Sequence, residues 1–270
     1  MTTRVLVTGI RGKTGVPLAA LLAERDVEVL GGSSDPSSVR LEGVVPTAFS
    51  WDDAPGWPAA LDGVDAVFVV RPDRSDAPGL VADLVAATAP GTRVVLLSER
   101  AADYPQLDHW ALRVEDAVRE GGRPWTILRP SWFMDVFTDP RFYRDEIAAG
   151  TLTFPGAEAR VAWVDARDIA AVAAVSLLDE GHTGQVYEIT GPESLTPAET
   201  AAALGVEPTE ASVEEAIDGM TGFDRDLSLV TFDRVRDGAF AEVTGDVERA
   251  TGRPARPLAA FVVDHASAWR

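Results

Sequence analysis

A glycine-spaced segment near the start of the chain has the residue types that could hold the phosphates of a dinucleotide. It runs Thr8-Gly9-Ile10-Arg11-Gly12-Lys13-Thr14-Gly15 and contains the only lysine of the chain. The first glycine permits a tight turn, the second lets the backbone approach a pyrophosphate closely, and the third lets a helix pack on a strand. Arg11 and Lys13 are the local cations. We expect the whole run from Gly9 to Gly15 to contact the cofactor.

The sequence on either side of this segment predicts the elements that would position it. An apolar run at residues 4–8 is typical of a buried strand, and residues 14–25 have the apolar spacing of a following helix. The first turn of that helix offers free N–H donors and a partial positive charge, and both favour a phosphate. A second strand is predicted at residues 27–30. A strand, a glycine turn, a helix and a further strand are the order that dinucleotide sites require.

Apolar strands alternate with helices along much of the chain. We predict strands at residues 4–8, 27–30, 44–49, 64–70, 93–98, 125–128, 161–164 and 186–189, and helices at 14–25, 58–61, 79–87, 106–120 and 166–178. This pattern indicates an α/β fold with a doubly wound parallel sheet, the Rossmann arrangement. Ligands of such sheets bind beyond the carboxyl ends of the strands, so Arg71, Ser98 and Pro130 are expected to contact the cofactor. Asp165 and Asp168 are expected to cap the last of these helices.

The domain organisation follows from where this rhythm changes. Residues 1–130 are predicted to form the dinucleotide-binding domain, with the sheet completed by residues from about 160 to 190. Residues 131–158 and 192–270 are richer in short helices and charge. We predict that they form a small interleaved α/β cap that selects the substrate. The alternative is that these segments form a peripheral helical layer with no role in selecting the substrate. Fold alone does not decide between the two, since it does not assign a function to a segment.

The composition excludes several classes of function. The 270 residues carry a formal net charge of -19, which would repel nucleic acid, and they include no cysteine for disulfides or thiolate metal sites. The histidines are isolated in sequence, so we expect no metal site. No segment approaches the roughly 20 apolar residues of a membrane span. We expect a cytoplasmic protein with a small-molecule substrate and no nucleic-acid or membrane partner, and the oligomeric state stays undetermined.

Two interpretations of the second strand lead to different cofactors. A carboxylate about 20 residues beyond the last glycine binds the ribose of NAD, and that count from Gly15 ends on Asp35. The strand is predicted to end at Gly31-Gly32, however, which puts Ser33 or Ser34 at the discriminating position. Small hydroxyls there, beside the cations of the glycine turn, would accept a 2′-phosphate. NADP(H) is therefore the preferred cofactor, and NAD(H) remains possible.

Four motifs in chain order resemble a known family. They are the glycine turn, Gly63-Val64-Asp65-Ala66-Val67-Phe68, then Trp125-Thr126-Ile127-Leu128-Arg129-Pro130 with Trp132-Phe133-Met134, and Val164-Asp165-Ala166-Arg167-Asp168-Ile169-Ala170. Together they are similar to the NmrA-like group of atypical short-chain dehydrogenases, and the third motif is nearest to the reductases of ergot alkaloid biosynthesis. The resemblance covers nearly the whole chain. It implies an NAD(P)H-dependent reductase, although the group also includes redox-sensing regulators without catalysis.

The catalytic pair of ordinary short-chain dehydrogenases is missing from this sequence. Those enzymes use Tyr-x-x-x-Lys, whose tyrosine donates a proton, but the only lysine here lies in the glycine turn. On the helix predicted at residues 106–120, His109 and Arg113 stand one turn apart. His109 is the candidate proton donor and Arg113 the candidate ribose contact, with a solvated surface pair as the alternative. Without a donor, the substrate must carry positive charge or take its proton from water, as an iminium or a quinone would.

Large apolar side chains offer a surface for a flat substrate. Trp110 on the same helix, and Trp132, Phe133 and Met134 after the predicted sixth strand, are the candidate substrate contacts, with plain packing as the alternative. The sequence thus predicts an NAD(P)H-dependent reductase that transfers hydride to an apolar or aromatic unsaturated small molecule of the iminium, quinone or enone type. The hydride chemistry belongs to the nicotinamide, which the protein positions. The alternative is a non-catalytic NAD(P)-sensing regulatory protein.

Overall fold

The chain folds into two compact units, and each is assembled from several segments of the sequence. The computed structural model describes residues 2–156 and 158–269. The first unit contains the residues up to Asp103, His109–Arg129 and Ile169–Tyr187. The second contains Tyr104–Asp108, Pro130–Asp168 and the residues from Glu188 onward. The chain therefore passes between the two units repeatedly.

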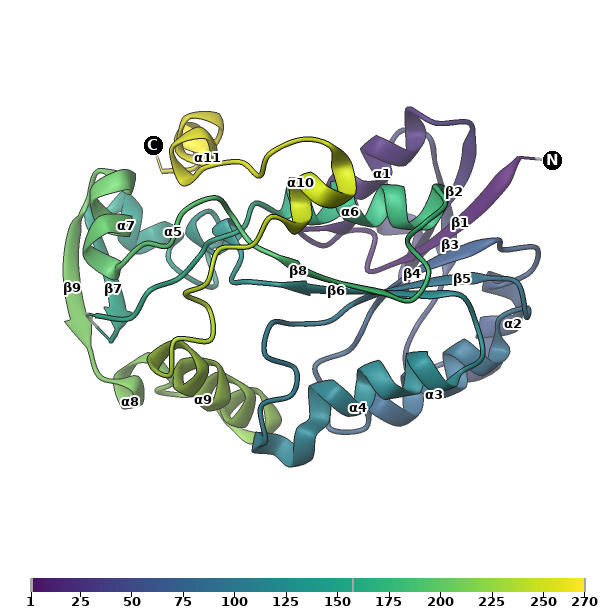
Figure 1. The fold of residues 1–270 in the computed structure, drawn as a ribbon, viewed down its shortest axis with the longest axis horizontal. Helices are drawn as coiled ribbons and strands as arrows, with labels where there is room; N and C mark the ends of the chain where they lie inside the picture. Colours follow the sequence, from purple (N-terminus) through teal and green to yellow (C-terminus); the bar gives the residue numbers. More distant parts are fainter. Residues whose placement is uncertain (1, 157, 270) are drawn as a thin grey trace. The chain divides into compact units, whose positions relative to one another are not determined.

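The first unit is built on a seven-stranded sheet with the strand order β3-β2-β1-β4-β5-β6-β8 (Figure 1). The strands are β1 (Thr3–Thr8), β2 (Val27–Ser33), β3 (Val44–Ala48), β4 (Ala66–Val70), β5 (Arg93–Leu97), β6 (Trp125–Pro130) and β8 (Gln185–Ile189). The pairs from β3 across to β6 are parallel. The strand order reverses between β1 and β4, and ligands of doubly wound sheets bind at this switch point. The predicted Rossmann-type α/β fold is confirmed.

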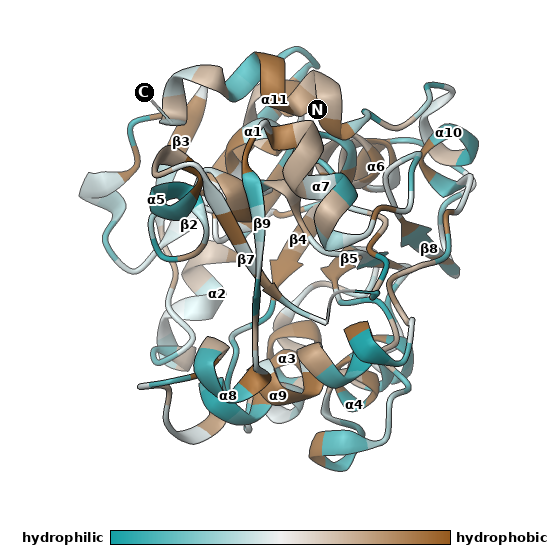
Figure 2. Ribbon diagram, turned by 90° about the vertical axis from the view of Figure 1, so that its left-hand side faces the viewer, coloured by the Kyte–Doolittle hydropathy of each residue, from teal (hydrophilic) through white to brown (hydrophobic). Residues whose placement is uncertain are grey.

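Helices cover both faces of this sheet. α1 (Gly15–Ala23) and α6 (Ala166–Leu178) lie on one face, and α3 (Ala77–Ala87) and α4 (Gln106–Glu120) lie on the other (Figure 1). The short elements are η1 (Pro36–Ser38), η2 (Ala54–Gly56) and α2 (Trp57–Ala60). The central residues of β1, β4 and β5 are fully buried, and β4 and β5 are brown in Figure 2. Burial on both faces explains why these strands are continuous apolar runs in the sequence.

The second unit has its own small sheet and its own core. β7 (Thr151–Pro155) and β9 (Glu207–Ala211) form a parallel two-stranded sheet. The helical elements are η3 (Met134–Phe137), α5 (Arg144–Ala148), α7 (Pro197–Leu204), α8 (Val213–Ala216), α9 (Gly222–Arg236), α10 (Asp246–Thr251), α11 (Leu258–His265) and η4 (Ala266–Trp269). The core gathers Phe137, Phe154, Trp163 and Phe261, none of them more than 3% exposed. This apolar cluster holds the short elements together.

Two parts of the second unit differ from the prediction. The sheet strand predicted at residues 161–164 is wrong, because Val161 and Val164 form only isolated bridges, to Leu195 and Phe133. That run is apolar because Trp163 packs into the core of the second unit. β9 was not predicted, because four of its five residues are exposed and it lacks the apolar alternation of a strand. Its backbone pairing with β7 makes it a strand.

Candidate functional site

The glycine turn joins β1 to α1 at the switch point of the sheet. Thr8, at the end of β1, donates its hydroxyl to Phe68 O at 3.1 Å and accepts from Val70 N at 2.8 Å, which ties β1 to β4. Gly9 has a φ of +69°, which favours glycine, and its carbonyl accepts from Gly12 N at 2.9 Å. The turn therefore leaves β1 sharply and brings Gly12 back over the strand end.

The three glycines of the turn have different surroundings. A Cβ on Gly15 would lie 2.4 Å from Gly9 O and 2.7 Å from Ile10 O, so only glycine fits there. Outside its two chain neighbours, a Cβ on Gly12 would meet one atom of the described residues within 4 Å, Gly9 O at 3.1 Å. Gly12 is exposed, as is Arg11, and Lys13 is half-buried. Ile10 is fully buried, so only its backbone can reach a ligand.

Thr14 provides a test of whether this turn suits a phosphate. It occupies the N-cap position of α1 but makes no capping hydrogen bond. Its residue is 3% exposed, and Oγ1 has no hydrogen-bond partner among residues 2–156 and 158–269. A buried hydroxyl without a partner is unfavourable. A hydroxyl beside the partial positive charge at the start of a helix suits an anionic ligand, so the residues present fit the phosphates of a dinucleotide.

The end of β2 separates the two cofactor interpretations. β2 ends at Ser33, one residue beyond the glycine pair at which its end was predicted, and Ser34 is exposed. Ser33 is buried and donates its hydroxyl to Asp35 O at 3.0 Å. The Asp35 carboxylate caps η1, accepting from Ser37 N at 3.1 Å and Ser37 Oγ at 2.6 Å. The carboxylate that would select NAD is therefore engaged in a local turn.

Arg71 follows β4 and is held by neighbouring charges. Its guanidinium pairs with Asp73 at 2.5 Å and with Glu99, and its carbon Cζ lies 4.3 Å from the centre of the Trp110 ring. Trp110 is 3% exposed, and its indole N–H donates to Arg74 O at 2.8 Å. The structure therefore brings Arg71 to the strand ends and packs Trp110 beneath it. The roles of Arg71 with the cofactor and of Trp110 with the substrate stay predictions.

Ser98 follows β5 and Pro130 is the last residue of β6, and both are buried. The Ser98 hydroxyl donates to Glu115 Oε1 at 2.7 Å. Glu115 lies on α4 and was not among the predicted site residues, because a single glutamate in an apolar helical stripe carries no sequence signal. Only the tertiary structure brings it to the strand ends.

The first turn of α4 has an unusual backbone. Leu107, Asp108 and His109 have φ values of +56°, +53° and +53°. A left-handed turn of L-residues costs about 1–2 kcal/mol per residue, and such strain often occurs at functional sites. The first turn of α4 therefore differs from the regular right-handed helix predicted at residues 106–120. Both side chains are exposed, and their roles remain predictions.

The predicted substrate residues of the second unit lie in an aromatic cluster. The half-buried Trp132 ring has its centre 5.4 Å from Phe154, 5.6 Å from Trp163 and 5.8 Å from Phe232. Phe133 is also half-buried, whereas Met134 is 1% exposed and belongs to the core. Phe232, on α9, is half-buried and was missed because nothing in the sequence links it to Trp132.

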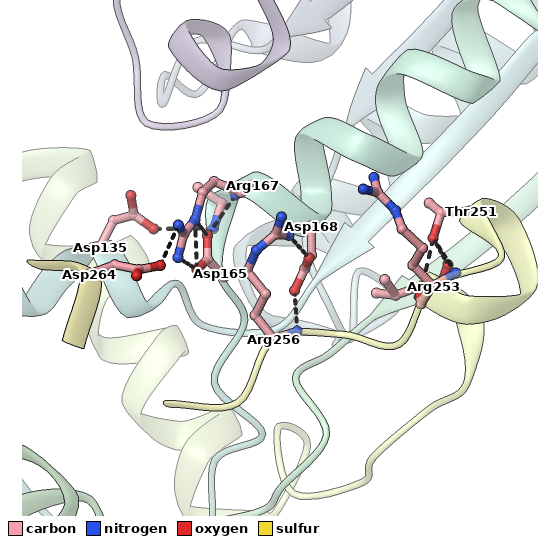
Figure 3. Close-up of polar contacts among 10 residues, drawn as sticks. Asp135, Asp165, Arg167, Asp168, Thr251, Arg253, Arg256 and Asp264 are labelled. Atoms are coloured by element: carbon pink, nitrogen blue, oxygen red, sulfur yellow. Dashed lines mark hydrogen bonds and ion pairs between the residues drawn. The ribbon is translucent and has the colours of Figure 1, made fainter. Parts of the chain in front are cut away.

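Acidic and arginine side chains surround the start of α6 (Figure 3). Asp165 caps the helix as predicted, accepting from Arg167 N at 2.8 Å. Asp168 does not cap it, because its carboxylate accepts from Arg256 N at 2.7 Å and pairs with the Arg256 guanidinium. Burial raises the pKa of Asp168, and the contacts with Arg256 oppose that shift. These pairs join α6 to the segment before α11, and they are structural.

Groups of three or more histidine or acidic side chains arranged to hold a metal ion do not occur within residues 2–156 and 158–269. In the same ranges, no helix has the length and apolar character needed to span a membrane.

Comparisons with known proteins identify the family and the fold of this chain. The pattern of the NmrA-like family matches residues 1–216. The NAD(P)H azoreductase of Xenophilus azovorans is 34% identical, over 98% of this chain and 99% of its own. The (4-alkanoyl-5-oxo-2,5-dihydrofuran-3-yl)methyl phosphate reductase of Streptomyces griseus is 35% identical, over 98% of this chain and 99% of its own. The structure of Citrobacter sp. triphenylmethane reductase complexed with NADP(H) has the same fold, with a TM-score of 0.80, 21% identity and coverage of 97% of this chain and 99% of that one.

Proposed function

Because this chain belongs to the NmrA-like family, we propose that it is an NAD(P)H-dependent reductase that prefers NADP(H) and reduces an apolar or aromatic unsaturated small molecule. The two relatives compared above are both reductases by name, and each aligns with nearly the whole of this chain. Their names concern different substrates, an azo compound and an unsaturated lactone phosphate. The family therefore supports the class of reaction, and the substrate follows from the residues of this chain.

The observation that carries the proposal is the buried Thr14 hydroxyl at the start of α1, which has no partner among the residues that the structure describes. It lies two residues from Gly12, and outside the chain neighbours of Gly12 the only atom of the described residues within 4 Å of a built Cβ there is Gly9 O. A turn that served only to connect a strand to a helix would satisfy or expose that hydroxyl. A phosphate at this position would accept from the Thr14 hydroxyl and from the N–H of Gly15, because Val16 N donates to Gly12 O at 3.2 Å and Pro17 has no N–H.

The preference for NADP(H) rests on the end of β2. Asp35 caps η1 through Oδ1, and this local contact competes with any contact between its carboxylate and a ribose. The exposed Ser34 hydroxyl and the cations Arg11 and Lys13 are the groups of this region that suit a 2′-phosphate. A carboxylate at this position would repel that phosphate, and a hydroxyl would bind it.

The bound nicotinamide would supply the hydride, and the residues of this chain position it and the substrate. Gly12 would leave room for the pyrophosphate, the Thr14 hydroxyl would donate to it, and the positive charge of Lys13 would attract it. Trp132 and Phe232 give the second unit a half-buried aromatic surface suited to a flat apolar substrate. Since no Tyr-x-x-x-Lys occurs in the sequence, we favour an iminium or quinone substrate, which needs no strong acid from the protein.

Steady-state reduction tests the proposal directly. The purified chain is mixed with NADPH or NADH and with a quinone, an azo dye, a cyclic iminium or an enone, and loss of the reduced-nicotinamide absorbance is followed. We expect turnover with at least one acceptor and a higher kcat/KM for NADPH. Tight NADPH binding without turnover of any acceptor would instead favour a non-catalytic NAD(P)-sensing regulator.

A matched pair of variants checks the cofactor assignment. Lys13→Ala should weaken NADPH binding by about 1–3 kcal/mol if the ammonium meets a phosphate, the usual range for a hydrogen bond to a charged group. It should weaken NADPH more than NADH if that phosphate is the 2′ one. Arg25→Ala, beyond the other end of α1, removes a surface cation paired with Asp179 and should change neither affinity. Equal effects of the two variants would contradict the assignment.

A further inference from the structure

A buried carboxylate on α4 accepts four hydrogen bonds at the carboxyl ends of β5 and β6. Glu115 is fully buried, and its Oε1 accepts from Ser98 Oγ at 2.7 Å and from Arg129 Nε at 2.8 Å. Its Oε2 accepts from Nη2 of Arg129 and from Nη2 of Arg119, both at 2.7 Å. These four bonds use the acceptor positions of a carboxylate, and the contact with Arg129 is a bidentate fork.

The partners of Glu115 come from different elements of the first unit. Ser98 follows β5, Arg129 lies in β6, and Arg119 lies one turn further along α4. Arg119 also pairs with Asp116 at 2.9 Å, so the two guanidiniums face two carboxylates. One side chain therefore fixes α4 against two neighbouring strand ends with directional bonds.

Stability alone is a weak reason for such a cluster. Apolar side chains of similar volume often stabilise a fold as well as a buried ion pair does, because the charges must be removed from water. Directional hydrogen bonds fix the register of a helix and the orientation of a hydroxyl, whereas apolar contacts do not. The Ser98 hydroxyl gives its proton to Glu115 and can offer a ligand only its lone pairs. It therefore suits a ribose hydroxyl or an amide N–H, and not a phosphate.

We propose that Glu115 is a positioning residue for the nicotinamide half of the dinucleotide site. The inference rests on the proposed binding of NADP(H). A doubly wound sheet binds the two halves of a dinucleotide on either side of its switch point. The glycine turn and the end of β2 lie on the side of β1, and the ends of β5 and β6 lie on the side of β4. Glu115 acts on that second side only, through Ser98 and through the position of α4.

The test compares two ligands in a variant that keeps a balanced core. Glu115→Leu combined with Arg129→Met replaces the central pair by apolar side chains, because Glu115→Leu alone would leave Arg129 buried without its carboxylate. NADPH and adenosine 2′,5′-bisphosphate, which lacks the nicotinamide half, are titrated by calorimetry into the full chain. We expect the Kd of the bisphosphate to stay within about twofold and that of NADPH to rise about tenfold, roughly the effect of one well-placed hydrogen bond.

Two single variants complete the experiment and cover a double variant that fails to fold. Ser98→Ala keeps the pairs of Glu115 with both arginines and should raise the Kd of NADPH about threefold with the bisphosphate unchanged, a smaller share of the same bond energy. Arg119→Met keeps the bonds of Glu115 to Ser98 and Arg129 and should bind both ligands as the parent does.

Each other result contradicts the inference. Unchanged NADPH affinity in the double variant and in Ser98→Ala would mean that Glu115 serves stability alone. A parallel loss of both ligands would indicate general damage to the site. A parent protein that binds neither ligand would overturn this inference together with the cofactor assignment, whereas a parent that binds NADPH and reduces no acceptor would overturn only the proposed activity.

Discussion

A side chain on Gly15 would stand 2.4 Å from the carbonyl oxygen of Gly9. The start of α1 thus presses against the first residue of the turn that precedes it, and no rotamer of a larger side chain relieves the contact, because Cβ itself is too close. Gly12 is different, since its built Cβ meets only Gly9 O, at 3.1 Å. Gly15 is therefore required for packing between α1 and the turn, whereas Gly12 leaves space at the protein surface for a ligand.

This difference predicts opposite outcomes for substitutions at the two positions. Gly12→Val should keep the fold and abolish NADPH binding, because the added side chain would occupy the approach of the pyrophosphate. Gly15→Ala should lower the free energy of unfolding by about 1–3 kcal/mol, the usual effect of forcing atoms into a packed region. Chemical unfolding and calorimetry measure both effects. A folded Gly12→Val protein with undiminished NADPH affinity would remove the glycine turn from the site.

His109→Ala tests whether the protein supplies a proton. We expect the variant to keep most of its turnover, because His109 is exposed and the favoured substrates accept hydride without a strong acid. A general acid usually contributes about 10²–10⁴ in rate. Turnover below about a hundredth of the parent rate, with unchanged NADPH affinity, would show that His109 is the acid after all.

Asp108 tests the left-handed turn at the start of α4. Glycine adopts a φ of +53° without strain, whereas alanine does not, so Asp108→Gly should be more stable than Asp108→Ala by about 1 kcal/mol. Both substitutions remove the same carboxylate, and the comparison therefore isolates the backbone. In a right-handed helix the order would reverse by a similar amount, since glycine is then the poorer residue. Denaturant unfolding of the two variants decides between the two backbones.

Asp168→Asn tests the effect of burial on a charge. The pKa of Asp168 is raised above its ordinary value of 3.8, chiefly by burial, so the folded protein holds the proton more tightly than the unfolded chain does. Its contribution to stability is therefore complete below that ordinary value and declines as the pH rises through the folded-state pKa.

The measurement is the unfolding free energy of the parent minus that of Asp168→Asn, which cancels the titration of the other carboxylates. We expect this difference to fall as the pH rises above the ordinary pKa of 3.8, because only the parent titrates at this position. A difference that grows with pH would mean that the pair with Arg256 outweighs burial.

The sequence by itself determined the elements whose signals are local. The continuous apolar runs of β1, β4 and β5 predicted buried parallel strands, and the spacing of Gly9, Gly12 and Gly15 predicted the turn between β1 and α1. The bounds of α4 and α6 agree with the prediction at both ends. These features depend on the periodic spacing of apolar side chains and on the conformational freedom of glycine. Both can be recognised within a short stretch of sequence.

The tertiary structure decided which polar groups meet. Asp168 was expected to cap α6, yet its partner is Arg256, 88 residues away. In the sequence, Glu115 is a single glutamate among apolar helix residues. In the fold, Ser98 and Arg129 both donate hydrogen bonds to it. β9 is a strand only because β7 lies beside it. A buried polar group must find a partner wherever the fold supplies one, and that choice depends on distances between remote segments, which no local pattern of residues contains.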